Sequence, residues 1–100
     1  MSLSIMQWHK VCYTCWTKYR IVTKDSLEEH HILGGALRGF SERYGLKVWL
    51  CHNHHNEPPD GVHYNAAASN ELKKQAQAAF EARYGHERWM QEVGKDYLSC

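Results

Sequence analysis

Apolar side chains recur every fourth residue in the second half of the chain, with lysine, glutamine and glutamate at many of the positions between them. Residues four apart lie on one face of an α-helix, so this spacing predicts a helix over residues 66–84 with one buried face. Gly85 follows as a natural stop, because glycine readily ends a helix. The residues that share the apolar face are Leu72, Ala76, Phe80 and Tyr84.

A second, shorter helix is expected near residues 86–93, where Trp89, Met90 and Val93 supply the apolar positions. These side chains suit core packing. The exposed faces of the last two helices, Trp89 among them, equally suit a homodimer contact.

The first half of the chain has the shorter periodicity of strands. Residues 46–51 (LKVWLC) alternate and predict a strand, while residues 8–24 place aromatic and β-branched residues around two cysteines. The latter pattern favours a zinc knuckle followed by a short strand. Gly34 and Gly35 mark a turn, and residues 58–61 (PPDG) mark a loop. With no linker or internal repeat, the sequence predicts one α+β domain over residues 1–100.

Composition narrows the class of protein. A chain of 100 residues buries only a limited surface on folding, so a bound metal ion would stabilise it considerably. Twelve lysines and arginines against eleven acidic residues give a formal charge of +1, so composition alone does not indicate a nucleic-acid binder. The chain lacks an apolar run of membrane-spanning length and a signal-peptide pattern, so we expect a cytoplasmic protein with no membrane partner.

Cysteines in a reducing compartment are more often metal ligands than disulfides. Cys12 and Cys15 form one closely spaced pair and Cys51 and His54 another, and two such pairs describe a closed, four-ligand structural zinc site. A redox pair at the first two cysteines is the alternative. Cys100, the last residue, is expected to be a mobile free thiol, with a ligand role as its alternative.

The remaining histidines suggest a second, more open ion. Neighbouring side chains on a strand point to opposite faces, so His30 and His31 are expected to differ in role, one binding metal and the other acting as a general base. His55 diverges from His54 by about 100 degrees on a helical turn and would face a different ion. His63 follows the proline loop and could return to the cluster as a ligand or phosphate contact. Surface or hydrogen-bonding roles suit the other three, His9, His52 and His86. A closed structural zinc site together with an open metal site and a neighbouring base indicates a metal-dependent enzyme acting on phosphate esters.

The order of these motifs resembles the HNH endonucleases, the zinc-containing branch of the ββα-metal (His-Me finger) nucleases, and is most similar to small phage-borne members related to recombination-enhancement nucleases. The resemblance covers about residues 10–65, from the Cys-x-x-Cys pair through EEHHILGG and LRGFSERYGLKVWLC to HNHHNEPPDGVHYN. It implies a zinc-stapled, treble-clef-like ββα-metal core, followed by C-terminal helices over about residues 66–95.

The resemblance also implies a role for each matching residue. His30 would be a ligand of the catalytic ion, and His31 the general base. His55, directly after the last zinc ligand, would be a second ligand of the catalytic ion, and His63 matches a later family histidine that is a ligand or phosphate contact. Arg38 stands in the family's usual basic position and would contact phosphate.

The implied activity is hydrolysis of phosphodiester bonds in nucleic acid, with double-stranded DNA as the expected partner and with 5′-phosphate and 3′-hydroxyl products. The catalytic ion would be Mg²⁺, Mn²⁺, Ni²⁺ or Zn²⁺, in addition to the structural Zn²⁺. Because the net charge is small, tight binding would require a homodimer or an accessory DNA-binding protein. The alternative is a non-catalytic, zinc-stabilised module that binds nucleic acid or protein.

One position departs from the family pattern. The asparagine that gives the family its middle letter usually precedes the third zinc ligand and helps to orient the base. Here that stretch is GLKVWLC, which contains no asparagine. A backbone carbonyl, Asn56 or Asn65 would then have to orient His31.

Overall fold

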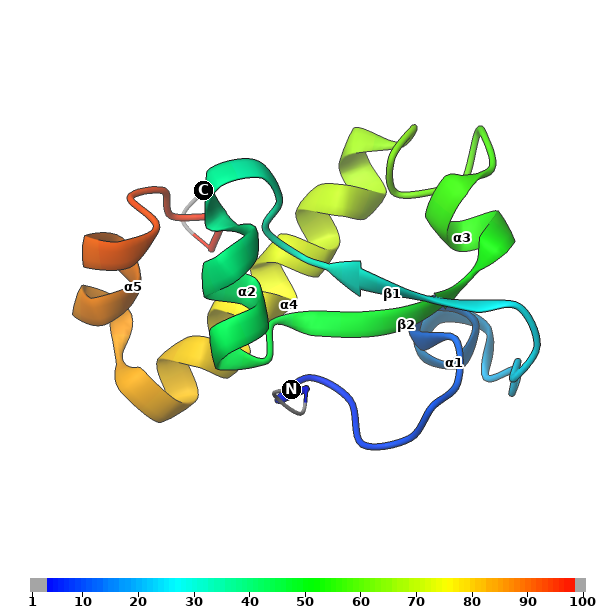
Figure 1. The fold of residues 1–100 in the computed structure, drawn as a ribbon, viewed down its shortest axis with the longest axis horizontal. Coiled ribbons are helices and arrows are strands. Elements are labelled where there is room, and N and C mark those ends of the chain that lie inside the picture. The colour runs from blue at the N-terminus through cyan, green and yellow to red at the C-terminus, as the bar shows by residue number, and fades with distance from the viewer. Residues whose placement is uncertain (1–3, 99–100) are drawn as a thin grey trace.

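The computed structural model describes residues 4–98, which form a two-stranded sheet surrounded by helices. In chain order the elements are α1 (Tyr13–Tyr19), β1 (Leu27–His31), the 3-10 helix η1 (Gly35–Leu37), α2 (Arg38–Tyr44), β2 (Lys47–Cys51), α3 (His52–Asn56), α4 (Ala66–Tyr84) and α5 (His86–Glu92). Figure 1 shows α1 and α3 at one end of the sheet, α2 and α5 toward the other, and α4 running diagonally behind it. This is the mixed α+β class expected from the sequence.

The two strands are antiparallel, and their register decides which side chains meet. Leu27 pairs with Cys51 at one end, and His31 pairs with Lys47 at the other. Side chains alternate along a strand, so Glu28 and His30 share one face of β1. Glu29 and His31 share the opposite face. The strand predicted over residues 46–51 is thereby confirmed, as is the turn at Gly34 and Gly35, where Gly35 has a φ of 56°.

The long helix α4 has the bounds predicted from its apolar spacing. Asn65 caps its first turn by accepting a hydrogen bond from the Ala68 backbone N–H. Within the predicted apolar face Leu72, Ala76 and Phe80 are buried in the core that also contains strand residues, whereas Tyr84 at the end of the helix is 45% exposed.

Helix α5 confirms the predicted final helix and turns Trp89 inward. The Trp89 side chain is 0% exposed, and its ring lies 5.6 Å from that of Phe80 and 6.4 Å from that of Tyr97. Its indole N–H donates to the Lys95 carbonyl oxygen. The alternative of Trp89 as an exposed dimer contact is therefore wrong, because the residue is fully enclosed by its own chain.

The short strand predicted after the first cysteine pair is also wrong. Residues 13–19 form α1, which ends at Arg20 in the left-handed conformation, and the chain then runs without regular structure until β1. The β-branched Ile21 and Val22 are 56% and 58% exposed, and within residues 4–98 neither pairs with a strand. Their strand propensity is therefore not realised in the described part of the chain.

Among residues 4–98, no helix combines the length and the apolar character needed to cross a bilayer. The alternatives weighed for Cys100 concern a residue that lies outside the described part of the chain.

Candidate metal centres

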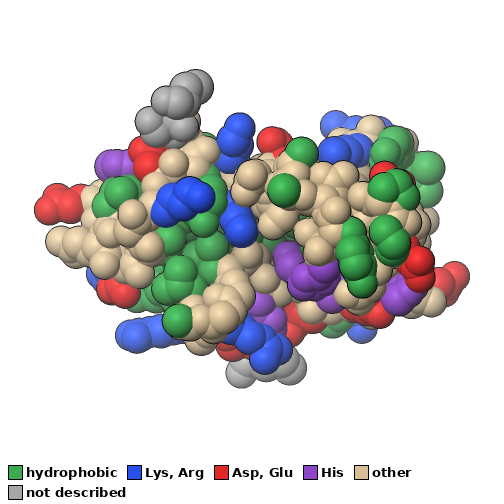
Figure 2. Space-filling model, turned by 90° about the horizontal axis from the view of Figure 1, so that it is seen from above, with side chains coloured by type: hydrophobic (Ala, Val, Ile, Leu, Met, Phe, Trp, Pro, Cys, Tyr) green, Lys and Arg blue, Asp and Glu red, His purple; other side chains and the backbone are tan. Residues whose placement is uncertain are grey.

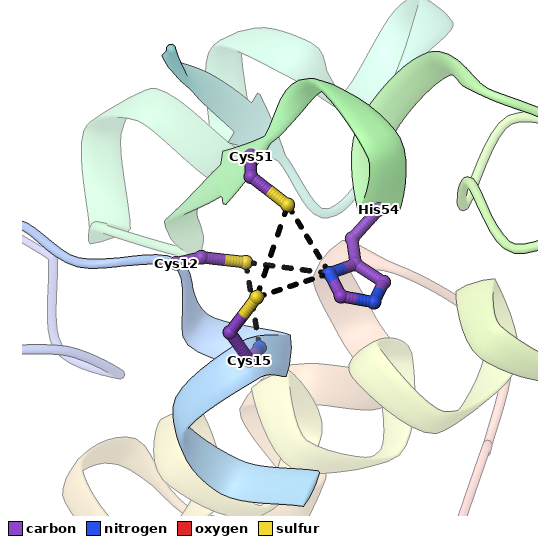
Figure 3. A group of neighbouring side chains, drawn as sticks. All are labelled: Cys12, Cys15, Cys51 and His54. Atoms are coloured by element: carbon purple, nitrogen blue, oxygen red, sulfur yellow. Dashed lines mark hydrogen bonds between the residues drawn. The ribbon is translucent and has the colours of Figure 1, made fainter. Parts of the chain in front are cut away.

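Four thiol and imidazole side chains from three elements meet beside one end of the sheet (Figure 3). Cys12 is the residue before α1, Cys15 lies in its first turn, Cys51 ends β2, and His54 follows in α3. Their ligand atoms all lie within 4.8 Å of one another. The four side chains predicted to form a closed site are thus brought together, although Cys51 lies 36 positions after Cys15 in the sequence.

The distances within this group match those around one tetrahedral ion. Zinc bonds sulfur at about 2.3 Å and nitrogen at about 2.0–2.1 Å, so tetrahedral angles separate two sulfurs by about 3.8 Å and a sulfur from a nitrogen by about 3.5 Å. The sulfurs of Cys15 and Cys51 are 3.9 Å apart, and Nδ1 of His54 lies 3.2–3.6 Å from the three cysteine sulfurs. The cluster could therefore hold a metal such as zinc with every coordination position filled by protein.

The surroundings of His54 suit a metal ligand. Burial lowers the pKa of His54, with Lys18 acting in the same direction and Asp60 opposing it. A lowered pKa favours the neutral imidazole, which is the form that binds a metal. The ring of Tyr19 stacks on it, with centroids 6.0 Å apart and an angle of 18° between the planes.

Three more histidines converge on a second point. His30 of β1, His55 of α3 and His63 of the following loop place their ligand nitrogens within 4.8 Å of one another. The Nε2 atoms of His55 and His63 are 3.0 Å apart, the separation expected for two nitrogens bound at about 2.1 Å and at a right angle on one ion. Figure 2 shows a group of histidine side chains on the face of the molecule seen from above. Unlike the first cluster, this one has three protein ligands and an exposed side.

The innermost of these histidines is held in the neutral form. His30 is 8% exposed, and burial, followed by the charges of His55, His63 and His31, lowers the pKa of His30 to about 3. A neutral imidazole at this position is ready to bind a cation without first losing a proton. All three residues predicted for the second ion are therefore gathered in one place with chemistry suited to binding it.

A carboxylate behind the cluster fixes the orientation of His55. Nδ1 of His55 donates to Oε1 of Glu28 over 2.7 Å, and the Asn56 side-chain amide donates to the same oxygen over 2.7 Å. His52 bonds to the other oxygen of Glu28 over 3.2 Å. Hydrogen bonds from His55 first, and then from His52, lower the pKa of Glu28. The contact of Nδ1 with Glu28 leaves Nε2, the atom nearest His63, as the nitrogen of His55 that could bind a metal, an arrangement common among metal-binding histidines.

A tight loop returns the chain so that His63 can reach the cluster. Gly61 donates its backbone N–H to the Glu57 carbonyl over 2.6 Å, and His63 donates its backbone N–H to the His55 carbonyl over 3.4 Å. A Cβ atom at Gly61 would lie 2.8 Å from backbone atoms of Glu57. The loop predicted around the two prolines therefore depends on a glycine at its closest approach.

His31 lies on the opposite face of β1, beside two carboxylates and a lysine. Its Nε2 is 3.5 Å from Oε1 of Glu42 and 3.9 Å from Oε1 of Glu29. Lys47 Nζ contacts Glu42 over 2.5 Å and Glu29 over 3.4 Å. Burial alone would lower the pKa of Lys47, but the hydrogen bond to Glu42 and the charge of Glu29 raise it. The two carboxylates and His31 have metal-ligand spacing, yet the Lys47 ammonium already supplies the cation there.

The residues expected to orient His31 in place of the missing asparagine lie elsewhere. Asn56 bonds to Glu28 on the other face of the sheet, and Asn65 caps α4. The expectation that Asn56 or Asn65 orients His31 is therefore wrong, because the Asn56 side chain is hydrogen-bonded to Glu28 and the Asn65 side chain caps a helix terminus. Of the two carboxylates near the imidazole, that of Glu42 lies nearer, 3.5 Å from Nε2 against 3.9 Å for Glu29.

Arg38 is exposed at the start of α2 and lines a hollow of about 400 Å³ together with His31. Gly39, Glu29 and Glu42 complete the lining. The predicted base and the predicted phosphate contact therefore open onto the same space, and none of the three histidines of the open cluster lines it.

Three residues around these clusters were not predicted from the sequence: Glu28, Glu42 and Lys47. The run EEHH contained a usable signal for the first of them, because strand alternation places Glu28 on the face of His30 and Glu29 on the face of His31. Nothing comparable pointed to Glu42 or Lys47, whose meeting depends on α2 packing beside the strand.

The three histidines predicted to have surface or hydrogen-bonding roles behave as expected. His9 is exposed, His52 bonds to Glu28 and Glu57, and His86 bonds to Glu81.

Comparison of the chain with models of protein families, with curated proteins and with solved structures found no match.

Proposed function

We propose that this protein is a metal-dependent endonuclease of the HNH type that hydrolyses phosphodiester bonds in DNA. The observation that supports this most strongly is the separation of the two clusters, one closed by four ligands and one left open with three imidazoles. A closed site suits a structural zinc, and an open one suits an ion that must also bind substrate. A purely structural module needs only the first.

The arrangement of β1, β2 and α3 supports a ββα-metal core. Both clusters take ligands from α3, so His54 on one side and His55 on the other join the structural centre to the catalytic one. In this scheme His30, His55 and His63 hold the catalytic ion. When bound, that ion supplies positive charge for the phosphate and the leaving oxygen.

His31 is the proposed general base. Its side chain is only 10% exposed, and its Nε2 faces Glu42, which leaves Nδ1 as the nitrogen to accept a proton from the attacking water. The hydrogen bond from Lys47, and then that from His31, lower the pKa of Glu42, so this carboxylate stays ionised and accepts a hydrogen bond from the imidazole. Glu42 thereby takes over the orienting task for which the sequence offers no asparagine.

Arg38 is proposed to bind a substrate phosphate. Its guanidinium belongs to the hollow that His31 also lines, and guanidinium groups bind phosphate oxygens through two parallel hydrogen bonds. Zinc as the structural ion, double-stranded DNA as one substrate and a cytoplasmic location belong to the same proposal.

The proposal is tested by nicking of supercoiled plasmid by zinc-loaded protein with added Mg²⁺, Mn²⁺, Ni²⁺ or Zn²⁺. We expect nicking with at least one ion, and a fall of about a hundredfold or more in the His31→Ala variant. The matched control is His86→Ala, which alters an exposed histidine outside both clusters. Nicking by His31→Ala at the wild-type rate would remove the general-base assignment. No nicking by wild type with any of the ions would favour the non-catalytic zinc module.

A further inference from the structure

Helix α1 and the segment that precedes it carry exposed aromatic rings. Trp8 is 91% exposed, Trp16 is 43% exposed and Tyr19 is 60% exposed. Rings of this size are seldom left in water without a partner, and a contiguous exposed patch with a polar rim commonly marks a binding site. We name this region the α1 surface and define it as the three rings together with Lys10, Lys18, Arg20, Val22 and Lys24.

A hollow of about 550 Å³ separates two of these rings. Trp8 and Trp16 both line it, and no lysine, arginine or carboxylate is among its lining residues. The rest of its apolar lining comes from Met6, Val11, Tyr13 and Val22. A flat, uncharged ring could therefore enter this space and stack on an indole.

The charged side chains of residues 8–24 are all basic. Residues 8–24 contain four lysines and arginines and no aspartate or glutamate, which leaves eight basic residues against all eleven acidic ones elsewhere. The four side chains, Lys10, Lys18, Arg20 and Lys24, are exposed. Two of them already lie over aromatic rings, since Arg20 is 5.2 Å from the Trp16 centroid and Lys10 is 4.4 Å from that of Trp49. A polyanion is the partner that this charge complements.

Aromatic rings interleaved with cations form the surface that proteins use for unpaired nucleotides. Bases stack on the rings, and lysine and arginine follow the phosphates. In a duplex the faces of the bases are covered by their neighbours, so the rings and the hollow would have nothing to stack on. The α1 surface also adjoins the closed metal centre, because Tyr19 stacks on His54, and the next residue in α3, His55, belongs to the open cluster.

We infer that the α1 surface binds single-stranded DNA and guides an unpaired strand toward the open histidine cluster. This inference rests on the proposed nuclease function for its meaning, but binding can be measured without cleavage. A nuclease with this surface would act preferentially where a duplex frays, branches or ends in a single-stranded tail.

The test is fluorescence anisotropy of labelled oligodeoxythymidylate with zinc-loaded protein and no other divalent ion. We expect tighter binding than to a duplex of equal length. The Trp8→Ala/Trp16→Ala variant should bind about fivefold to a hundredfold more weakly, the range for losing base stacking, and Trp8→Phe/Trp16→Phe should restore much of the affinity. Zinc content and far-UV circular dichroism of each variant show that these exposed substitutions leave the domain folded.

Salt dependence tests the role of the cations. Four phosphate contacts on a single strand give a slope of log K against log salt of about −3, and removing two of them should reduce its magnitude by about 1.4. Lys10→Ala/Lys24→Ala should show that reduction. Lys74→Ala/Arg83→Ala, which removes the same charge from the exposed side of α4, should leave the slope nearly unchanged.

The possible results separate this inference from the proposed nuclease. Equal affinity for duplex, or for oligouridylate, or unchanged affinity after loss of both tryptophans, would overturn the α1 surface as a single-stranded DNA site even if plasmid is nicked. Preferential binding of the oligodeoxythymidylate that depends on the tryptophans would support the site even if no ion promotes nicking.

Discussion

Replacing Glu28 with alanine should weaken the open metal site without disturbing the closed one. Glu28 accepts the Nδ1 proton of His55 over 2.7 Å and so leaves Nε2 of that ring free to bind an ion. Loss of such a partner commonly costs tenfold to a hundredfold in metal affinity. The Glu28 side chain is 37% exposed, so water partly replaces it, and we expect the lower part of the range, about tenfold to thirtyfold.

The assay is calorimetric titration of zinc-loaded protein with Mn²⁺, and the matched control is Glu29→Ala. Glu29 is the next residue on β1 but lies on the opposite face, where it contacts Lys47 and not the open cluster. Both variants should retain one zinc per chain. A Glu28→Ala affinity within twofold of wild type, or an equal loss in Glu29→Ala, would refute the reasoning that Glu28 orients His55.

Three further outcomes are expected. Gly61→Ala should lower the affinity of the open site for Mn²⁺ but leave the zinc content unchanged. The new Cβ would lie 2.8 Å from backbone atoms of Glu57 and displace the loop that holds His63. An unchanged Mn²⁺ affinity would contradict this. Chelation of zinc should abolish the far-UV circular dichroism of the folded domain, since one buried ligand, Cys12, ties α1 to the rest of the core; a folded apoprotein would show that the core suffices without metal. The hydrogen bond to Glu81 raises the pKa of His86 above its usual value near 6.5. Below about pH 6.5, wild type should therefore have a higher free energy of unfolding than His86→Gln, and this advantage should be lost as pH rises through the raised pKa. A difference that does not depend on pH would contradict the pairing of His86 with Glu81.

The parts of the fold that could be predicted are those set by residues close together in the sequence. The apolar spacing of α4 and the short Cys-x-x-Cys and Cys-x-x-His intervals depend on residues a few positions apart, and a helix or a tight turn fixes their geometry. The same holds for the strand ending at Cys51, whose alternation survives in β2. The grouping of the candidate metal ligands was predictable because cysteine and histidine at these spacings are typical of metal sites.

Contacts that depend on long-range packing could not be predicted in this way. Glu42 approaches His31 only because α2 lies beside β1, and Lys47 joins them only because the strand register pairs it with His31. Conversely, Ile21 and Val22 have strand propensity but no partner strand, so tertiary context overrode their local preference. Trp89 was ambiguous for a similar reason, since a helix pattern does not say what covers its apolar face.

Cleavage by a single variant of the open site tests the central claim most directly. Nicking of supercoiled plasmid is measured for zinc-loaded wild type and His55→Ala, each with and without the second divalent ion. We expect wild type to nick only when that ion is added, and His55→Ala to retain one zinc per chain while losing nicking by about a hundredfold or more. Nicking by wild type without the second ion, or by His55→Ala at the wild-type rate, would contradict the division of this protein into a structural and a catalytic metal centre.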